Sequence, residues 1–176
     1  MAADVARPQG AAVRILGIDP GLRHTGWGVI DAEGNRLRFV ASGAVEPGVH
    51  GSMSDRLHRL FVEVRAIIDS FKPHECAIED TFVNKNPQST LKLGHARAAA
   101  MLAPAERGLA VFEYKPNLVK KSVVGAGHAE KDQVAAMVRM LMPGSDAATK
   151  DAADALAVAI CHAHHRASAL RLVAAR

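Results

Sequence analysis

The chain has 176 residues, of which 49% are apolar and only 4% aromatic, and its formal charge is +4 with an isoelectric point near 9.3. This length fits one domain that can bury a sizeable core. No apolar run approaches the roughly 20 residues of a membrane span, and the N-terminus lacks the basic start and apolar stretch of a signal peptide. We therefore expect a cytoplasmic protein without membrane segments. Its basic character is compatible with a polyanionic partner but does not establish one.

The two cysteines, Cys76 and Cys161, lie in neither a CxxC pattern nor a Cys/His metal spacing. We expect two small buried thiols in a reducing compartment rather than a disulfide or a metal site.

The first part of the chain alternates apolar runs with glycine-containing turns. It predicts strands over 13–19, 25–31 and 36–45, with a hairpin turn at 32–35 between the last two. Strands joined by such short connections are expected to be antiparallel.

The rest of the chain is expected to alternate helices with two more strands. Apolar residues at three- and four-residue steps predict a helix that ends before Pro73, and Asn86 suits the cap of a helix that begins at Pro87. In chain order, the expected elements are a helix over 53–71, a strand over 74–80, a helix over 87–104, a strand over 108–114, and two or three helical pieces with breaks near 125–127 and 142–144. This order predicts an α/β fold with a mixed sheet and helices on its faces.

Asp19 is the last residue of one predicted strand, and Glu79 is the penultimate residue of another. Asp19 also suits the first position of an Asp-Pro-Gly turn, where its side chain would only bond the backbone. A second strand with the same ending indicates a shared acidic rim, because neighbouring strands lie only about 5 Å apart.

Two further acids, Asp151 and Asp154, are three residues apart and would share one face of a helix. Acids near a helix start are also favoured by the helix dipole, which suits Asp151 better than Asp154 because an apolar run follows the latter at once. Should all four acids converge, they would repel one another unless cations bind. Their oxygen ligands suit Mg²⁺ or Mn²⁺, and two such ions about 3.5–4 Å apart can promote phosphodiester cleavage.

Four segments, "GIDPGLRHTGWGVID", "AIEDTFVNKNPQSTLKLGHARA", "VFEYKPNLVKKSVVGAGHAEKDQV" and "DAADALAVA", together resemble the RuvC family of Holliday-junction resolvases. The resemblance extends from residue 15 to about residue 164. It implies an RNase H-like fold with a mixed five-stranded sheet and helices on both faces. It also implies a homodimeric, Mg²⁺-dependent endonuclease, with Mn²⁺ as a substitute metal and two ions in each active site.

The substrate implied by this resemblance is a four-way DNA junction, nicked symmetrically on two strands of like polarity during recombination and repair. A branch-migration helicase is the implied partner, and the bacterial cytoplasm, at the nucleoid, the implied location. The positions that match the family's catalytic, metal-binding acids are Asp19, Glu79, Asp151 and Asp154.

Five positions match or adjoin DNA-contacting positions of the family. Phe82 matches an aromatic residue near the junction centre, and its place on a polar loop just past a strand favours stacking on an exposed base over core packing. Lys120 and Lys131 match basic positions close to the scissile phosphate, and Lys85 and Lys121 lie nearby. A single surface lysine is usually just solvated, but Lys120, Lys121 and Lys131 flank a flexible glycine-containing loop suited to phosphate.

Some features allow more than one interpretation. Small residues in the helix over 87–104 suit a dimer contact or burial against the sheet. The "HAHH" segment, with His162, His164 and His165, suits a metal site or, more simply, histidines at a helix end. In the resulting domain plan, residues 1–12 form a disordered lead, 13–166 the nuclease domain and 167–176 a basic tail.

Two rival functions remain open from the residues alone. An actin-like or sugar-kinase phosphate site also begins with a Gly-Ile-Asp-x-Gly turn, but it needs a second lobe and not the pair Asp151 and Asp154. A non-catalytic junction-binding module would keep the basic loop without needing the four acids.

Overall fold

The computed structural model describes residues 11–81, 86–145 and 149–174, so most of the predicted lead (1–10) and the segment 82–85 lie outside it. The elements in chain order are β1 (Val13–Asp19), β2 (Thr25–Glu33), β3 (Arg36–Val45), α1 (Met53–Phe71), β4 (Glu75–Glu79), α2 (Pro87–Glu106), β5 (Ala110–Tyr114), α3 (Pro116–Val124), α4 (Lys131–Leu141) and α5 (Lys150–Ala174). No helix in these ranges is long and apolar enough to cross a membrane.

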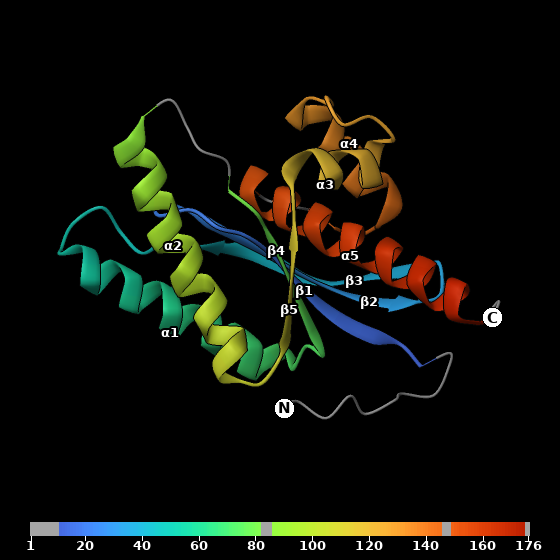
Figure 1. Ribbon diagram of the computed structural model, residues 1–176, viewed down its shortest axis with the longest axis horizontal. Coiled ribbons are helices and arrows are strands. Elements are labelled where there is room, and N and C mark those ends of the chain that lie inside the picture. The colour runs from blue at the N-terminus through green and yellow to red at the C-terminus, as the bar shows by residue number, and fades with distance from the viewer. Residues whose placement is uncertain (1–10, 82–85, 146–148, 175–176) are drawn as a thin grey trace.

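The five strands form one mixed sheet in the order β3-β2-β1-β4-β5 (Figure 1). The first three strands are antiparallel neighbours, whereas β1 pairs with β4, and β4 with β5, in parallel. The sheet and the antiparallel pairing of the first three strands are as predicted.

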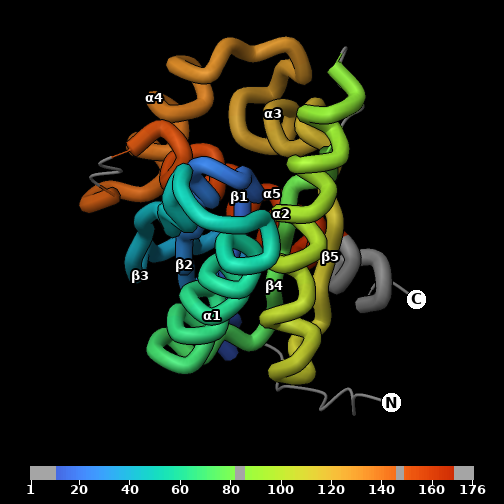
Figure 2. Tube along the Cα trace, turned by 90° about the vertical axis from the view of Figure 1, so that its left-hand side faces the viewer, coloured from blue at the N-terminus to red at the C-terminus, as the bar shows by residue number. Residues whose placement is uncertain are grey.

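Helices cover both faces of the sheet, as expected. Helices α1 and α2 lie on one face, and α5 lies on the other together with α3 and α4 (Figures 1 and 2). Two buried clusters result, one beneath each helical layer. Because side chains alternate along a strand, Ile15 of β1 faces α5 while Leu16 and Ile18 face α1 and α2.

The cap predicted at Asn86 is confirmed, Ser52 is a cap that was not predicted from the sequence, and α2 ends two residues later than predicted. The side chain of Ser52 caps α1, and that of Asn86 accepts hydrogen bonds from the backbone of Gln88 and Ser89 at the start of α2. Helix α2 continues two residues beyond Pro104 to Glu106. Pro104 has no N–H to donate to the preceding turn, but its carbonyl accepts hydrogen bonds from the N–H groups of residues 107 and 109, where the helix ends.

The prediction that "HAHH" marks a helix end is wrong, because α5 continues to Ala174. His162 is buried within this helix, where its Nδ1 lies 2.7 Å from the Tyr114 hydroxyl and its Nε2 lies 2.7 Å from Oε2 of Glu75. Arg166 donates to the same carboxylate. These partners are far away in sequence, so no local pattern could reveal them. The expected burial of the thiols at Cys76 and Cys161 is confirmed.

Three glycines let the backbone of α5 lie directly on the sheet. A Cβ atom on Gly17 would lie 2.2 Å from the carbonyl oxygen of Ala155, and one on Gly26 would lie 2.0 Å from that of Asp151. At Gly28 an added Cβ would lie 2.6 Å from the side chain of Leu156. Since any larger residue would push the helix away, these positions fix the height of the N-terminal half of α5 above β1 and β2.

We predict that Gly17→Ala lowers the free energy of unfolding by about 2–3 kcal/mol, because the added methyl meets helix backbone that cannot move aside alone. Gly43→Ala is the matched control, since its Cβ would meet the side chain of Trp27 at 2.9 Å and not helix backbone. Urea unfolding should place Gly17→Ala well below Gly43→Ala. Equal losses would show that the contact between α5 and the sheet is not tight.

Candidate active site

Asp19 and Glu79 end two neighbouring parallel strands, β1 and β4. Ile18 pairs with Ile78 in the register of these strands, so the two acids follow at the same level. Strand alternation gives Asp19 the face of Ile15 and Glu79 that of Ala77, which is the face covered by α5. The two carboxylates therefore lie side by side at the C-terminal ends of these two central strands, beneath that helix.

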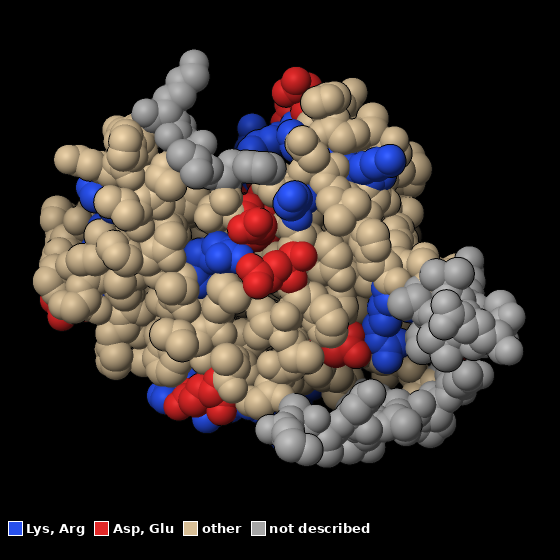
Figure 3. Space-filling model, viewed as in Figure 1, with Lys and Arg blue, Asp and Glu red and all other residues tan. Residues whose placement is uncertain are grey.

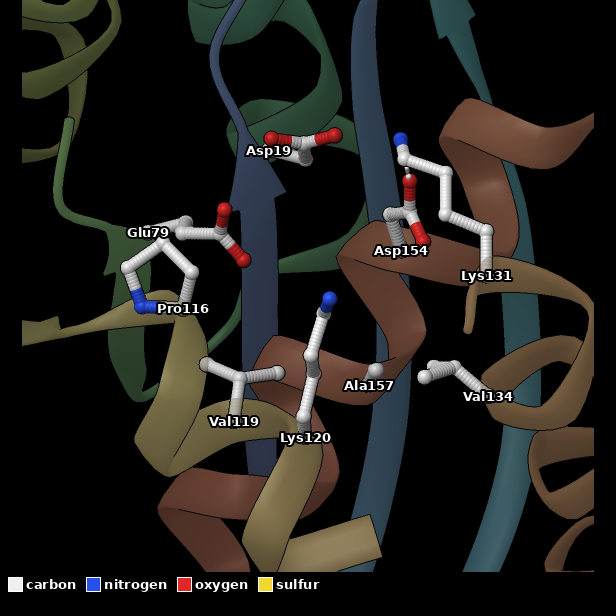
Figure 4. Close-up of a pocket in the computed structure, with 9 residues that line it drawn as sticks. All are labelled: Asp19, Glu79, Pro116, Val119, Lys120, Lys131, Val134, Asp154 and Ala157. Atoms are coloured by element: carbon white, nitrogen blue, oxygen red, sulfur yellow. Dashed lines mark hydrogen bonds and ion pairs between the residues drawn. The ribbon is translucent and has the colours of Figure 1, made fainter. Parts of the chain in front are cut away.

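A small pocket of about 100 Å³ joins these acids to three helices (Figure 4). Asp154 enters it from α5, Lys120 from α3 and Lys131 from α4. Its remaining lining is mostly apolar and consists of Pro116, Val119, Val134 and Ala157. Three predicted acids and two predicted lysines thus come together from distant parts of the chain.

Asp151 does not line this pocket, although it lies close by. Its backbone rests on Gly26, which pairs with Asp19 across β1 and β2. Its charge is near enough to contribute to the raised pKa of Asp19. The structure therefore brings the fourth predicted acid to the margin of the cluster.

The carboxylates destabilise one another's charged forms. Burial, followed by repulsion from Asp154, raises the pKa of Asp19 from 3.8 to about 7. Burial, followed by repulsion from Asp19, raises the pKa of Glu79 from 4.5 to about 8. Both lysines of the pocket oppose the rise at Glu79, but they do not cancel it.

Lys131 balances part of this charge directly. Its Nζ lies 2.6 Å from Oδ2 of Asp154, and this hydrogen bond raises the pKa of the ammonium group. Lys131 is the first residue of α4, whose start is fixed by reciprocal hydrogen bonds between Glu130 and Gln133. The turn that begins α4 therefore holds the lysine over the acids.

The donor chemistry of the pocket fits a hard divalent cation. Its acidic groups are all carboxylates, and oxygen ligands of this kind suit Mg²⁺ or Mn²⁺ better than Zn²⁺. Within the described ranges, no three His, Cys, Asp or Glu side chains are arranged to hold one ion together, and Asp154 is bonded to Lys131 instead. The pocket therefore has the carboxylate ligands that a divalent cation needs. In this conformation, however, Lys131 neutralises part of their negative charge.

The other predicted DNA contacts are less defined. Lys121 is exposed and does not line the pocket, and Phe82 and Lys85 lie outside the described residues. Figure 3 shows acidic and basic side chains side by side at the middle of one face, in the region between α2 and α3. Sequence reasoning missed the apolar walls from α3 and α4, for which the pattern of the chain offers no signal beyond ordinary helix burial.

Comparison with known proteins shows the family of this chain. Residues 15–162 match the model of the family described as "Crossover junction endodeoxyribonuclease RuvC". The proteins of that name from Paramagnetospirillum magneticum and Rhodospirillum rubrum are 58% and 57% identical to this chain. Each alignment covers 93% of this chain, and 98% and 97% of the respective relative.

Solved structures give the same picture. The structure of Thermus thermophilus RuvC in complex with Holliday junction substrate matches with a TM-score of 0.82 and 31% identity, over 89% of this chain and 96% of that one. The yeast mitochondrial Holliday junction resolvase shares the fold, with a TM-score of 0.64 at 14% identity.

The sheet topology and the carboxylates at its central strand ends define a nuclease with an RNase H-like fold. More specifically, the chain belongs to the RuvC family of crossover junction endodeoxyribonucleases. Family membership favours the nuclease over the sugar-kinase and non-catalytic alternatives.

We predict that Asp19→Asn stabilises the metal-free protein at high pH. A carboxyl group with a raised pKa favours folding while protonated, and this contribution is lost as pH rises through its folded-state pKa, about 7 for Asp19. The variant should match the wild type near pH 4 and exceed it by on the order of 2 kcal/mol at pH 8. Urea unfolding in EDTA at several pH values measures this difference.

Asp132→Asn is the control, because that side chain is 90% exposed and one residue from Lys131. The difference in free energy of unfolding between Asp132→Asn and the wild type should not grow as the pH rises. If Asp19→Asn and Asp132→Asn respond alike, the repulsion at Asp19 is not as described.

Proposed function

We propose that this chain resolves four-way DNA junctions by metal-dependent hydrolysis of phosphodiester bonds, during homologous recombination and DNA repair. The observation that carries the proposal is the convergence of Asp19, Glu79 and Asp154 beside Lys120 and Lys131 in one pocket. The names of the relatives support the choice of junction DNA as substrate.

In this proposal Asp19, Glu79, Asp151 and Asp154 hold divalent cations, Mg²⁺ or alternatively Mn²⁺, two in each site. Bound ions supply an activated water and stabilise the leaving oxygen. The carboxylates must be ionised to bind them, and the raised pKa values of Asp19 and Glu79 make metal binding release protons near neutral pH.

The lysines of the pocket bind the scissile phosphate in this proposal. Lys131 is 65% exposed at its side chain while bonded to Asp154, so its ammonium group can also meet a phosphate from solvent. Lys120 lies across the same pocket (Figure 4). Lys85 and Lys121 assist on the DNA backbone, and Phe82 stacks on a base at the junction centre, an interaction that contributes about 1–3 kcal/mol.

A homodimer supplies the two sites for paired, symmetric nicks. The outer face of α2 exposes apolar side chains, with Leu91 64% and Leu102 61% exposed, and Phe112 on the edge strand β5 is 40% exposed. A second copy of the chain seated on α2 would cover Leu91 and Leu102, and exposed apolar side chains of this kind are typical of protein interfaces. A branch-migration helicase completes the proposed assembly, which acts at the nucleoid in the bacterial cytoplasm.

We predict that Asp19→Asn and Asp154→Asn each reduce cleavage of a synthetic four-way junction by about 100-fold or more, because each removes a ligand for the ions. Junction binding in EDTA should be unchanged or tighter, since one negative charge is lost. Gel analysis of nicked products with and without Mg²⁺ makes the measurement, with Asp132→Asn as control. Normal cleavage by either pocket variant would contradict the proposed site.

We predict that Leu102→Arg converts the dimer to a monomer, because it places a charge in the apolar contact. Sedimentation velocity should show the change, and paired nicking should fall to single nicks. Val49→Arg, at an exposed apolar position in the loop between β3 and α1, should remain dimeric. A dimeric Leu102→Arg variant would exclude this face.

A further inference from the structure

Arg97, in the middle of α2, joins that helix to the ends of two strands. Its guanidinium group is ion-paired with Glu113 of β5 and lies 3.4 Å from Oδ1 of Asp80, the residue that follows β4. Only 18% of its side chain is exposed, and its Nε is buried without a hydrogen-bond partner within the described part of the chain. An arginine this buried restricts the groups that it contacts.

The contact reaches the residue next to Glu79. Strand alternation points Glu79 towards α5 and Asp80 towards α2. The N–H of Asp80 donates to the carbonyl of Tyr114 at 2.8 Å, and Oδ1 of Asp80 accepts from the N–H of Thr81 at 2.9 Å. Arg97 therefore restrains the end of β4 from the α2 side of the sheet, while Glu79 points into the pocket on the α5 side.

A second hollow, of about 110 Å³, lies on this side of the acids. Asp19 and Glu79 line it together with Asp80 and with Leu93, which is one helical turn before Arg97 on α2. The pair Asp19 and Glu79 thus separates two hollows, and α2 forms part of the wall of the second.

Arg97 also removes a repulsion that would spread the strand ends. Glu113 pairs with Ile78, and Tyr114 with Glu79, so Glu113 and Asp80 lie on the same face at the ends of adjacent strands. Like charges across neighbouring strands are destabilising. One nitrogen of the guanidinium group, Nη2, faces both carboxylates. The rigid planar group fixes where this nitrogen lies, whereas the ammonium group of a lysine sits at the end of a flexible stem.

We propose that Arg97 is a positioning residue that fixes the Glu79 carboxylate for metal binding by clamping Asp80 and Glu113 to α2. This inference rests on the proposed function, since it assigns Glu79 to the metal site. It adds that α2, whose outer face is the proposed dimer contact, also sets the geometry of the catalytic edge.

The test compares Arg97→Gln with Arg107→Gln in the full-length chain. Arg107, the residue that follows α2, pairs with Asp69 of α1 at 2.8 and 2.6 Å. It therefore also ties the end of α2 to its neighbour, but far from the acids. Mg²⁺ and Mn²⁺ binding is measured by calorimetry without DNA. We expect Arg97→Gln to weaken binding by about 10-fold and Arg107→Gln to leave it unchanged.

Hydrogen exchange gives a readout that does not depend on metal or activity. Arg97→Gln should speed exchange at the amides of Asp80 and Thr81 while the protection of β1 and β2 remains, whereas a general loss of stability would speed exchange throughout. Faster exchange at every strand, with unchanged metal affinity, would overturn the proposal.

Arg97→Lys keeps the charge and separates charge from geometry, and it provides a folded variant if Arg97→Gln does not fold. We expect its metal affinity to fall between those of the wild type and Arg97→Gln. Wild-type affinity in Arg97→Lys would overturn the clamp. Failure of the proposed function looks different, because the wild type would then not nick junctions at all, whatever the behaviour of Arg97.

Discussion

The contact between the backbone of α5 and the glycines of the sheet is the constraint on which the site depends. Gly17 and Gly26 leave no room for a side chain, so α5 lies against β1 and β2 at backbone distance. This contact brings Asp154 to the level of the strand ends that carry Asp19 and Glu79. A pocket of about 100 Å³ results, whereas a helix held at ordinary side-chain distance would leave the acids apart.

The same arrangement places stability and function in conflict. Burial and mutual repulsion raise the pKa values of Asp19 and Glu79, so the metal-free pocket is unfavourable at the pH where its carboxylates must be ionised. Lys131 relieves part of this through Asp154, and bound cations would relieve the rest. Strained electrostatics of this kind are typical of functional sites.

Local signals were sufficient for much of the fold. Apolar runs bounded by turns predicted the strands, and Asn86 caps the helix start that it predicted. The acids at the strand ends were also visible in the sequence, because each follows an apolar run. Their assignment to one site came mainly from the family resemblance. What the sequence could not reveal depends on distant partners: the contact of Arg97 with Asp80, and the burial of His162 inside a helix that was expected to end there.

The bond between His162 and Glu75 has a consequence for the alignment of α5 with β4. Glu75 and Glu79 are four residues apart on the strand, a span of about 13 Å at 3.3 Å per residue. His162 and Asp154 are eight residues apart on the helix, about 12 Å at 1.5 Å per residue. The two lengths nearly agree and run in opposite directions along the chain. The bond between His162 and Glu75 therefore brings Asp154 level with Glu79 at the other end of the two elements. In this way a buried imidazole sets the position along α5 of a carboxylate about two helical turns away.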